Sequence, residues 1–294
     1  MLLGGMLGGY ALAEPFRLTV TRHRLSPVGW PAGLELRVAV LADLHACDPW
    51  MTPAHVARIV AQTNALSPDL VLLLGDFVAG YRMGRFSRLV PHAAWAAELA
   101  RLHAPLGRHA VLGNHDWWEE VEVQDRRKGP TRAGLALQAA GIPVYENSAV
   151  RLVKNGQAFW LAGLGDQWAF WPKDRRWRGR GSVPYDGVDD LPATLAGIDD
   201  AAPVILMAHE PDIFPSVPRR VALTVSGHTH GGQVRFLGYA PIVPSRYGRR
   251  YLHGVFVEDG RHLVVSSGLG VSGLPVRFSV PPEIVVIELG GRAG

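Results

Sequence analysis

The fold is decided by residues 36–45, which read Leu-Arg-Val-Ala-Val-Leu-Ala-Asp-Leu-His. A run of apolar, partly β-branched residues ends there in Asp43 and His45, as expected for a buried strand with polar side chains at its carboxyl end. Four further apolar runs end in the same way. They are residues 70–74 before Gly75-Asp76, 110–112 before Gly113-Asn114-His115-Asp116, 204–207 before Ala208-His209, and 221–225 before Gly227-His228-Thr229-His230.

These five blocks bring carboxylate, amide and imidazole groups to rigid strand ends. Such mixed oxygen and nitrogen donors suit divalent ions such as Mn²⁺, Fe²⁺ and Zn²⁺. His228 and His230 are the strongest pair, because alternate residues of an extended segment share a face and both imidazoles then converge. Asp43 or Asn114 alone would equally fit a turn, so the prediction of a metal site depends on the five blocks together.

Taken in order, the blocks resemble the calcineurin-like metallophosphoesterase superfamily, whose pattern reads D-x-H, G-D, G-N-H-D, a lone His and G-H-x-H. The resemblance extends from residue 36 to residue 289. Residues 231–233, 241–251 and 268–282 are similar to a narrower bacterial branch of membrane-associated phosphodiesterases, some of which act on UDP-diacylglucosamine in lipid A synthesis. One departure is the run Phe77-Val78-Ala79, because many members carry a second acid shortly after G-D.

The resemblance implies an α/β fold in which a two-sheet β-sandwich is flanked by helices, in four αββα layers, with the site at the strand carboxyl ends. It implies that Asp43, His45 and His230 hold one metal ion, that Asn114, His209 and His228 hold a second, and that Asp76 bridges the two. In this pattern a hydroxide that bridges the metals attacks phosphorus in line. His115, its ring oriented by Asp116, protonates the leaving oxygen or stabilises the transition state. Two Mn²⁺ ions are the expected cofactors, with Fe, Zn or Mg as alternatives.

Composition excludes a disordered chain, because 48% of the 294 residues are apolar and 19% are charged. The net charge of +4 suits an anionic substrate or membrane face, and equally an ordinary solvated surface. Cys47 is the one cysteine, so no intrachain disulfide forms, and this residue either lies near the metals or packs a loop. The histidines without a motif partner are expected to be structural or on the surface: His23, His55, His92, His103, His109, His253 and His262.

Helices are predicted from Pro53, after an N-cap at Thr52, and at residues 92–103 and 132–140. Their alternation with strands predicts a largely parallel sheet in the first half. Beyond residue 144 the chain is β-rich, with strands expected at 149–153, 158–164, 204–207, 221–225, 255–258, 262–266 and 284–289. We expect one metallophosphoesterase domain at 35–294. A lead-in at 1–34, the possible remnant of a membrane anchor, precedes it, and its residues 17–24 form an edge strand.

The roles of two segments can each be interpreted in several ways from the sequence. Residues 1–13 are uncharged but shorter than the roughly 20 apolar residues of a membrane span. They are the end of a membrane anchor, an interfacial segment, or a segment packed on the domain. Residues 168–185 mix aromatic residues with Arg and Lys, which fits a membrane interface, a stack on a base, or a loop that covers the core. Arg246, Arg249 and Arg277, in loops with Gly and Pro, either meet a diphosphate or are solvated.

The expected function is hydrolysis of a phosphodiester or pyrophosphate bond in a lipid-linked or nucleotide-sugar substrate. A nuclease or nucleotide phosphodiesterase of the same superfamily and an inactive metal-bearing scaffold are the alternatives. A nuclease would be expected to carry a longer basic groove, so nucleic acid is not the expected partner, and no obligate protein partner is inferred. We expect peripheral association with an anionic membrane surface, directly or through the N-terminal segment, on the cytoplasmic side. A soluble cytoplasmic enzyme is the alternative.

Overall fold

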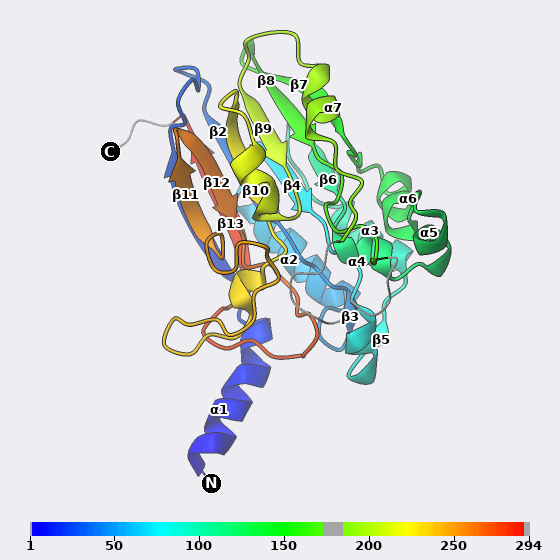
Figure 1. Ribbon diagram of the computed structural model, residues 1–294. Coiled ribbons are helices and arrows are strands. Elements are labelled where there is room, and N and C mark those ends of the chain that lie inside the picture. The colour runs from blue at the N-terminus through cyan, green and yellow to red at the C-terminus, as the bar shows by residue number, and fades with distance from the viewer. Residues whose placement is uncertain (1, 173–184, 291–294) are drawn as a thin grey trace.

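The computed structural model describes residues 2–172 and 185–290, with the backbone alone for residues 2–6 (Figure 1). The α-helices are α1 (Leu2–Ala13), α2 (Pro53–Ala65), α3 (His92–Leu99), α4 (Asn114–Trp118), α5 (Val121–Arg126), α6 (Arg132–Ala139) and α7 (Leu191–Ala196). Short 3-10 helices are η1 (Glu14–Phe16), η2 (Tyr81–Arg85), η4 (Pro211–Ser216) and η5 (His230–Gly232). The strands are β1 (Thr19–Leu25), β2 (Leu36–Leu41), β3 (Cys47–Asp48), β4 (Leu70–Leu74), β5 (Arg88–Leu89), β6 (Arg108–Val111), β7 (Ser148–Lys154), β8 (Gln157–Gly163), β9 (Val204–Met207), β10 (Val221–Ser226), β11 (Gly254–Glu258), β12 (Arg261–Val265) and β13 (Glu283–Leu289).

Two mixed sheets form the centre of the molecule (Figure 1). The first has the strand order β1-β13-β2-β4-β6, and β2, β4 and β6 run parallel to one another. The second has the order β11-β12-β10-β9-β8-β7, and β12, β10, β9 and β8 run parallel. The parallel sheet expected for the first half of the chain is therefore present, and the edge strand expected at residues 17–24 is β1.

The fold has four layers: helices, the first sheet, the second sheet, and further helices. Three apolar clusters fill the spaces between neighbouring layers. Leu70, Leu72 and Leu74 of β4 face the second sheet, whereas Val71 and Leu73 face the helices. This strand is buried on both faces, which explains its unbroken apolar run. Helices α2, α3 and α6 cover the outer face of the first sheet, and α7 and η4 cover that of the second. The predicted two-sheet sandwich flanked by helices is confirmed.

The helix predictions are confirmed where a cap or a long period marks the helix. Thr52 accepts a hydrogen bond from the N–H of His55 at the start of α2, and Thr131 accepts one from Gly134 at the start of α6. Helix α3 ends at Leu99, four residues before the predicted end. Helices α4, α5 and α7 were not predicted, because five or six residues are too few to show a helical period.

The N-terminal segment is helical despite its glycine pairs. Its last turn is attached to the body, since Ala11 accepts a hydrogen bond from the backbone N–H of Arg277 and the Tyr10 ring packs on Phe278. Among the described residues, no helix combines the length and the apolar character that a membrane crossing requires. The boundary between lead-in and domain at residue 34 stays a prediction; β1, within the lead-in, pairs with β13.

The aromatic segment 168–185 is described in part. Trp168 and Phe170 are buried, and the Trp168 ring stacks on Tyr185 while Trp118 packs against both Trp171 and Tyr185. A membrane contact through Trp168 or Phe170 is therefore wrong, because these side chains are already covered by protein. Lys173, Arg175, Arg176, Trp177, Arg178 and Arg180 lie outside the described residues.

Glu283 joins the first sheet to the loop between β12 and β13. Its carboxylate accepts hydrogen bonds from the Thr21 hydroxyl and the Ser267 N–H, and it lies 2.9 Å from Nε2 of His253. Burial acts to raise the pKa of Glu283, but His253 and these donors outweigh it and lower the pKa to about 2. The difference from the usual value of about 4.3 corresponds to about 3 kcal/mol of folding stability.

We expect Glu283→Gln to lower the free energy of unfolding at pH 7 by about 3 kcal/mol. Because the native pKa is depressed, this contribution is complete above about pH 5 and is lost as the pH falls towards 2, so the two proteins should converge in acid. Urea unfolding at pH 7, 5 and 3 measures this. Glu288→Gln, at the exposed end of the same strand, removes a pair with Arg24 and should cost about 1 kcal/mol or less. Equal effects of both variants would contradict this account.

Candidate metal centre

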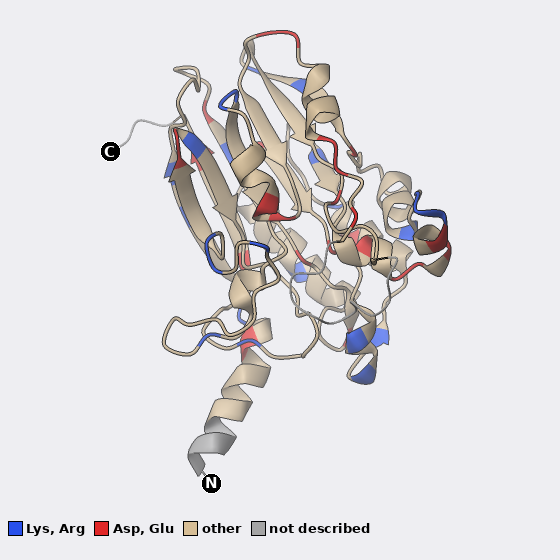
Figure 2. Cartoon of the chain, in the orientation of Figure 1, with Lys and Arg blue, Asp and Glu red and all other residues tan. Residues whose placement is uncertain are grey.

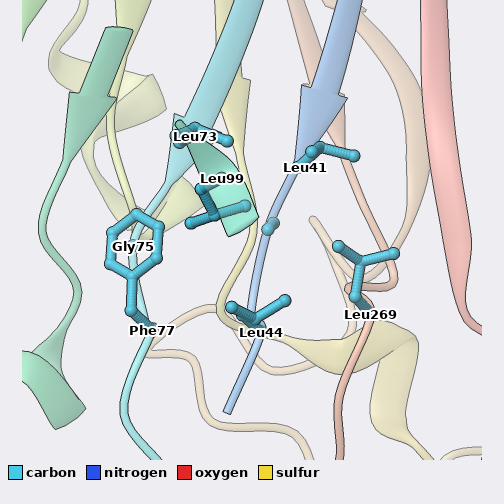
Figure 3. Close-up of a pocket in the computed structure, with 8 residues that line it drawn as sticks. Leu41, Leu44, Leu73, Gly75, Phe77, Leu99 and Leu269 are labelled. Atoms are coloured by element: carbon cyan, nitrogen blue, oxygen red, sulfur yellow. The ribbon is translucent and has the colours of Figure 1, made fainter. Parts of the chain in front are cut away.

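The strand ends that carry the five sequence blocks meet at one edge of the sandwich. Those of β2, β4 and β6 come from the first sheet, and those of β9 and β10 from the second. They border a pocket of about 560 Å³ whose lining includes Asp76, Asn114, His115, His228 and His230. The turns after β2 and β4 rest on apolar side chains around a small cavity, among them Leu41, Leu44, Leu73 and Phe77 (Figure 3). This apolar support holds the turns in place.

Five of the seven candidate ligands have a left-handed backbone. Their φ angles are +54° at Asp43, +47° at His45, +55° at Asp76, +69° at His228 and +52° at His230. For a residue with a side chain this conformation costs roughly 1–2 kcal/mol. Strain of this kind concentrates at functional sites, where the surrounding structure enforces it. The turns therefore give up stability to direct these side chains to one place.

Six of the seven candidate residues form two clusters that share one carboxylate. Ligand atoms of Asp43, His45, Asp76 and His230 lie within 4.8 Å of one another, and so do those of Asp76, His209 and His228. Oδ2 of Asp76 lies 3.5 Å from Nε2 of His45 and 3.4 Å from Nε2 of His209. Asn114, at the start of α4, is buried and lines the same pocket.

The hydrogen bonds around the clusters leave ligand atoms facing inward. Nδ1 of His45 donates to the carbonyl of Val78 at 3.0 Å, and Nδ1 of His209 to that of Leu74 at 2.6 Å, so both Nε2 atoms are directed at Asp76. This is the usual orientation of a metal-binding histidine. Oδ1 of Asn114 is buried without a hydrogen-bond partner. A buried amide oxygen without a partner is unfavourable, and a bound cation would satisfy it. Together with the two clusters, this oxygen gives a donor set that fits two divalent ions.

The electrostatics of the site favour the neutral form of three of the four ligand imidazoles and the protonated form of His209. Burial lowers the pKa of His45 to about 4 and those of His228 and His230 well below the usual value, which keeps them in the form that binds metals. Burial raises the pKa of Asp43 to about 7. Asp76 raises the pKa of His209 against the effect of burial. In the metal-free protein a proton therefore compensates the charge of Asp76, and metal binding would release it.

Asp116 does not orient the His115 ring as predicted. Its carboxylate accepts hydrogen bonds from the backbone N–H groups of Gly113, Asp76, Phe77 and Val78, at distances from 2.9 to 3.1 Å. These four amides occupy both oxygens. Asp116 therefore holds the turn after β6 against the turn after β4, and the sequence pattern alone did not distinguish this role from contact with the ring.

The His115 ring belongs to neither cluster, borders the one that holds His45, and faces the pocket. Its backbone N–H donates to Oδ1 of Asp76 at 2.8 Å, and its ring makes edge contacts with His45 and Trp118. Gly80 backs the ring so closely that a Cβ there would lie 2.4 Å from its Cε1 and 2.6 Å from its Nδ1. Glycine at position 80 is thus required by space alone, since its φ of −63° suits any residue.

Both interpretations of Arg277 are wrong, because this side chain is fully buried. It donates to the carbonyls of Gly270, Val280 and Ser267, and Nη2 lies 3.5 Å from Nδ1 of His230. The guanidinium fixes the loop behind one metal cluster. Arg246 and Arg249 are exposed, and Arg249 lies over the Tyr239 ring. Cys47 packs in a small cluster with Ala79, Met83 and Val271.

Three acidic residues beside the clusters were missed. Asp166 and Glu210 are buried next to His209, and burial raises the pKa of both carboxyls. A usable signal existed for Asp166, because Gly165-Asp166 follows an apolar run as Gly75-Asp76 does. Glu119 lies 3.4 Å from the His115 ring. It is four residues after His115, a spacing that would have paired them had the helix been predicted.

Comparison with known proteins shows which family of proteins this chain is similar to. Residues 36–232 match the family described as calcineurin-like phosphoesterase. The chain is 30% identical over 288 residues to an uncharacterized metallophosphoesterase, YkuE, of Bacillus subtilis (strain 168), covering 96% of this chain and 90% of that protein. It is 29% identical over 280 residues to phosphodiesterase YaeI of Escherichia coli (strain K12), and the match covers 94% of this chain and 90% of that protein. The identity to UDP-2,3-diacylglucosamine pyrophosphatase LpxG of Chlamydia trachomatis serovar D is 27% over 322 residues, with the same coverage.

The fold and the site thus define a metallophosphoesterase, a hydrolase of phosphoesters. The chain belongs to the calcineurin-like phosphoesterase family, because the family match covers residues 36–232 and the similarity to YkuE extends over nearly the whole chain.

We expect Gly80→Ala to displace the His115 ring and to lower the kcat for a phosphodiester with an alkoxide leaving group by on the order of 10-fold or more, because a misplaced catalytic group is costly. Metal content should not change, since the ring lies outside both clusters. Gly84→Ala, in the next turn of η2, is the control, because nothing lies within 4 Å of a Cβ at that position. Equal kcat values for the two variants would refute the steric argument.

Proposed function

We propose that the chain is a binuclear metal-dependent phosphoesterase that hydrolyses a phosphodiester or pyrophosphate bond in a lipid-linked or nucleotide-sugar substrate. The observation that carries this proposal is the position of Asp76, whose carboxylate belongs to both ligand clusters at the pocket. A carboxylate has two oxygens and is suited to join two cations.

The ligand assignment follows the two clusters. Asp43, His45 and His230 would hold one ion, Asn114, His209 and His228 the other, and Asp76 both. When bound, two such ions supply a nucleophile at neutral pH and neutralise charge on the phosphoryl group. Mn²⁺ is our choice, because the set has oxygen and imidazole donors and no thiolate.

The chain's own groups supply the remaining chemistry. His115 faces the pocket from outside the clusters and is placed to give a proton to the leaving oxygen. Asp116 keeps the turn of Asp76 and the helix that carries His115 in one arrangement through its four amide contacts. Burial of the ligands excludes bulk water from the space around Asp76.

An apolar wall of the pocket supports a substrate with a large organic group. Trp118, Trp168, Val234, Ile242 and Leu274 line the pocket beside the ligands. The names of two relatives agree with this class, since one is a phosphodiesterase and the other a pyrophosphatase for a diacylated nucleotide sugar. A free phosphate monoester would leave most of this wall uncovered.

We further propose peripheral membrane binding through the end of the molecule that holds α1 and the loops after β10 and β12 (Figure 1). Leu7 and Leu12 of α1 are exposed, Leu237 is fully exposed, and Ile242 and Leu274 extend from the pocket lining into solvent. The sequence of α1 contains no charged residue, and the described part of the helix is accordingly free of blue and red in Figure 2. Such a surface fits the headgroup region of a bilayer, on the side where the exposed Arg246 and Arg249 meet anionic lipid.

The metal proposal predicts two ions per chain and loss of activity on chelation, restored by Mn²⁺. His115→Ala should keep both ions and lose on the order of 10²–10⁴ in kcat, whereas Asp76→Ala should lose metal. Elemental analysis measures the metal content, and hydrolysis of a phosphodiester with an alkoxide leaving group, which needs the proton from His115, measures kcat. Full activity after exhaustive chelation would refute the proposal, and preferred cleavage of single-stranded DNA would favour the nuclease.

The membrane proposal predicts that the protein co-sediments with phosphatidylglycerol-containing vesicles at low salt and is released by salt. Leu237→Asp/Ile242→Asp should abolish binding, because charged side chains resist transfer into the headgroup region. Val121→Asp, an equally exposed apolar site on α5, is the control and should bind as the wild type does. Protein that stays in solution with these vesicles would contradict the proposal.

A further inference from the structure

The two ring nitrogens of His115 have different polar neighbours. Nδ1 lies 3.4 Å from Oε1 of Glu119, and Nε2 lies 3.5 Å from Oγ of Ser272. His115 and Glu119 are spaced i, i+4 along α4 and its C-cap, and their side chains are only 15% and 19% exposed. The pair is therefore largely removed from solvent, where a contact of this kind has more effect than at the surface.

The other carboxylates around α4 are engaged elsewhere. Asp116 uses both oxygens on backbone amides, and Oδ1 of Asp76 accepts the backbone N–H of His115. The run Phe77-Val78-Ala79, where similar proteins often carry a second acid, offers no charge, and Gly80 touches the ring directly. Among the described residues, Glu119 is the acid within hydrogen-bond distance of the ring.

We propose that Glu119 is the positioning residue for His115. This inference rests on the proposed function, in which His115 gives a proton to the leaving oxygen. A carboxylate only accepts, so the contact assigns the hydrogen to Nδ1 and turns Nε2 towards the pocket. As the bond from phosphorus to the leaving oxygen breaks, its electron pair stays on that oxygen, which takes the proton from Nε2. The ring becomes neutral and keeps its Nδ1–H towards Glu119.

The far side of the ring supports this orientation. The backbone N–H of Ser272 donates to Oε1 of Gln233 at 2.8 Å, and Nε2 of Gln233 donates to the carbonyls of Ser272 and Leu274. This clamp fixes the loop that faces Nε2. The His115 ring is thus held between a fixed loop and Glu119, and removal of the carboxylate takes away the acceptor that determines which ring nitrogen carries the hydrogen.

The experiment compares Glu119→Ala with wild type on two phosphodiesters that differ in their leaving group. With an alkoxide leaving group, which needs a proton, kcat should fall on the order of 10–100-fold, the usual effect of losing such an outer partner. With nitrophenolate, which needs little protonation, the loss should be less than about 3-fold. Glu119→Gln, which keeps an acceptor, should lie between wild type and Ala. Glu122→Gln removes an exposed charge nearby and should match wild type.

A double-mutant cycle separates positioning from a general structural effect. In a His115→Ala background, Glu119→Ala should change kcat no further, because it acts only through the ring. Metal content should remain that of wild type. With diamagnetic Zn²⁺ or Mg²⁺ in place of Mn²⁺, a protected Nδ1 proton of His115 should be visible by ¹H–¹⁵N NMR in the wild type and absent in Glu119→Ala.

Failure of this inference differs from failure of the proposed function. Wild-type protein without metal-dependent hydrolysis would refute the function. Suppose instead that the wild type is active and that His115→Ala has a low kcat. If Glu119→Ala then has the kcat of the wild type on both esters, the inference alone is refuted. Equal losses on both esters, or a further loss in the His115→Ala background, would also overturn it, because they indicate a role outside the ring.

Discussion

The site depends on one buried carboxylate that binds only backbone. Asp116 accepts four amide N–H groups, three from the turn after β4 and one from Gly113. Hydrogen bonds to a charged acceptor are about twice as strong as neutral ones, and here they join two neighbouring parallel strands beyond the point where the sheet ends. Asp76 stands in the turn that is held in this way, so the carboxylate shared by both ligand clusters is fixed by a residue that contacts it only through the backbone N–H of Asp76.

The second constraint is conformational. A strand that simply continued would send alternate side chains to opposite faces, and neighbouring ligands would diverge. The left-handed residues break this alternation at Asp43, His45, His228 and His230. Glycines make the crowding possible: a Cβ at Gly113 would lie 2.5 Å from Oδ1 of Asp76, and one at Gly227 would lie 2.7 Å from Oδ2 of Asp43. The strain is local, while the two sheets behind it, packed through Leu72, Ile205 and their neighbours, supply the rigidity that maintains it.

The sequence predicts the strands and the inward-facing polar residues well, because both depend on local pattern. The run of residues 70–74 is apolar on both faces and then ends in Gly-Asp, and it forms β4 with those bounds. What the sequence did not predict depends on neighbours distant in the chain. Arg277 looks like a solvated loop residue until three carbonyls from residues 267–280 enclose it. Trp168 looks interfacial until Tyr185 and His228 cover its ring. The metal roles of the seven ligands remain predictions, although six of them converge into two clusters and Asn114 lines the same pocket, as such roles require.

Arg277 also links the site to the N-terminal helix. Its side chain lies beside His230, and its backbone N–H donates to the carbonyl of Ala11 in the last turn of α1. The next residue, Phe278, packs on Tyr10, whose hydroxyl donates to the buried Glu14. Two adjacent residues of one loop therefore contact both a candidate metal ligand and the base of the apolar helix. A bilayer that held α1 would fix the direction in which the pocket opens, since the helix and the ligand loop share their attachment. This coupling requires no motion: it follows from a guanidinium that is buried away from bulk solvent and must therefore use the carbonyls that shape the loop.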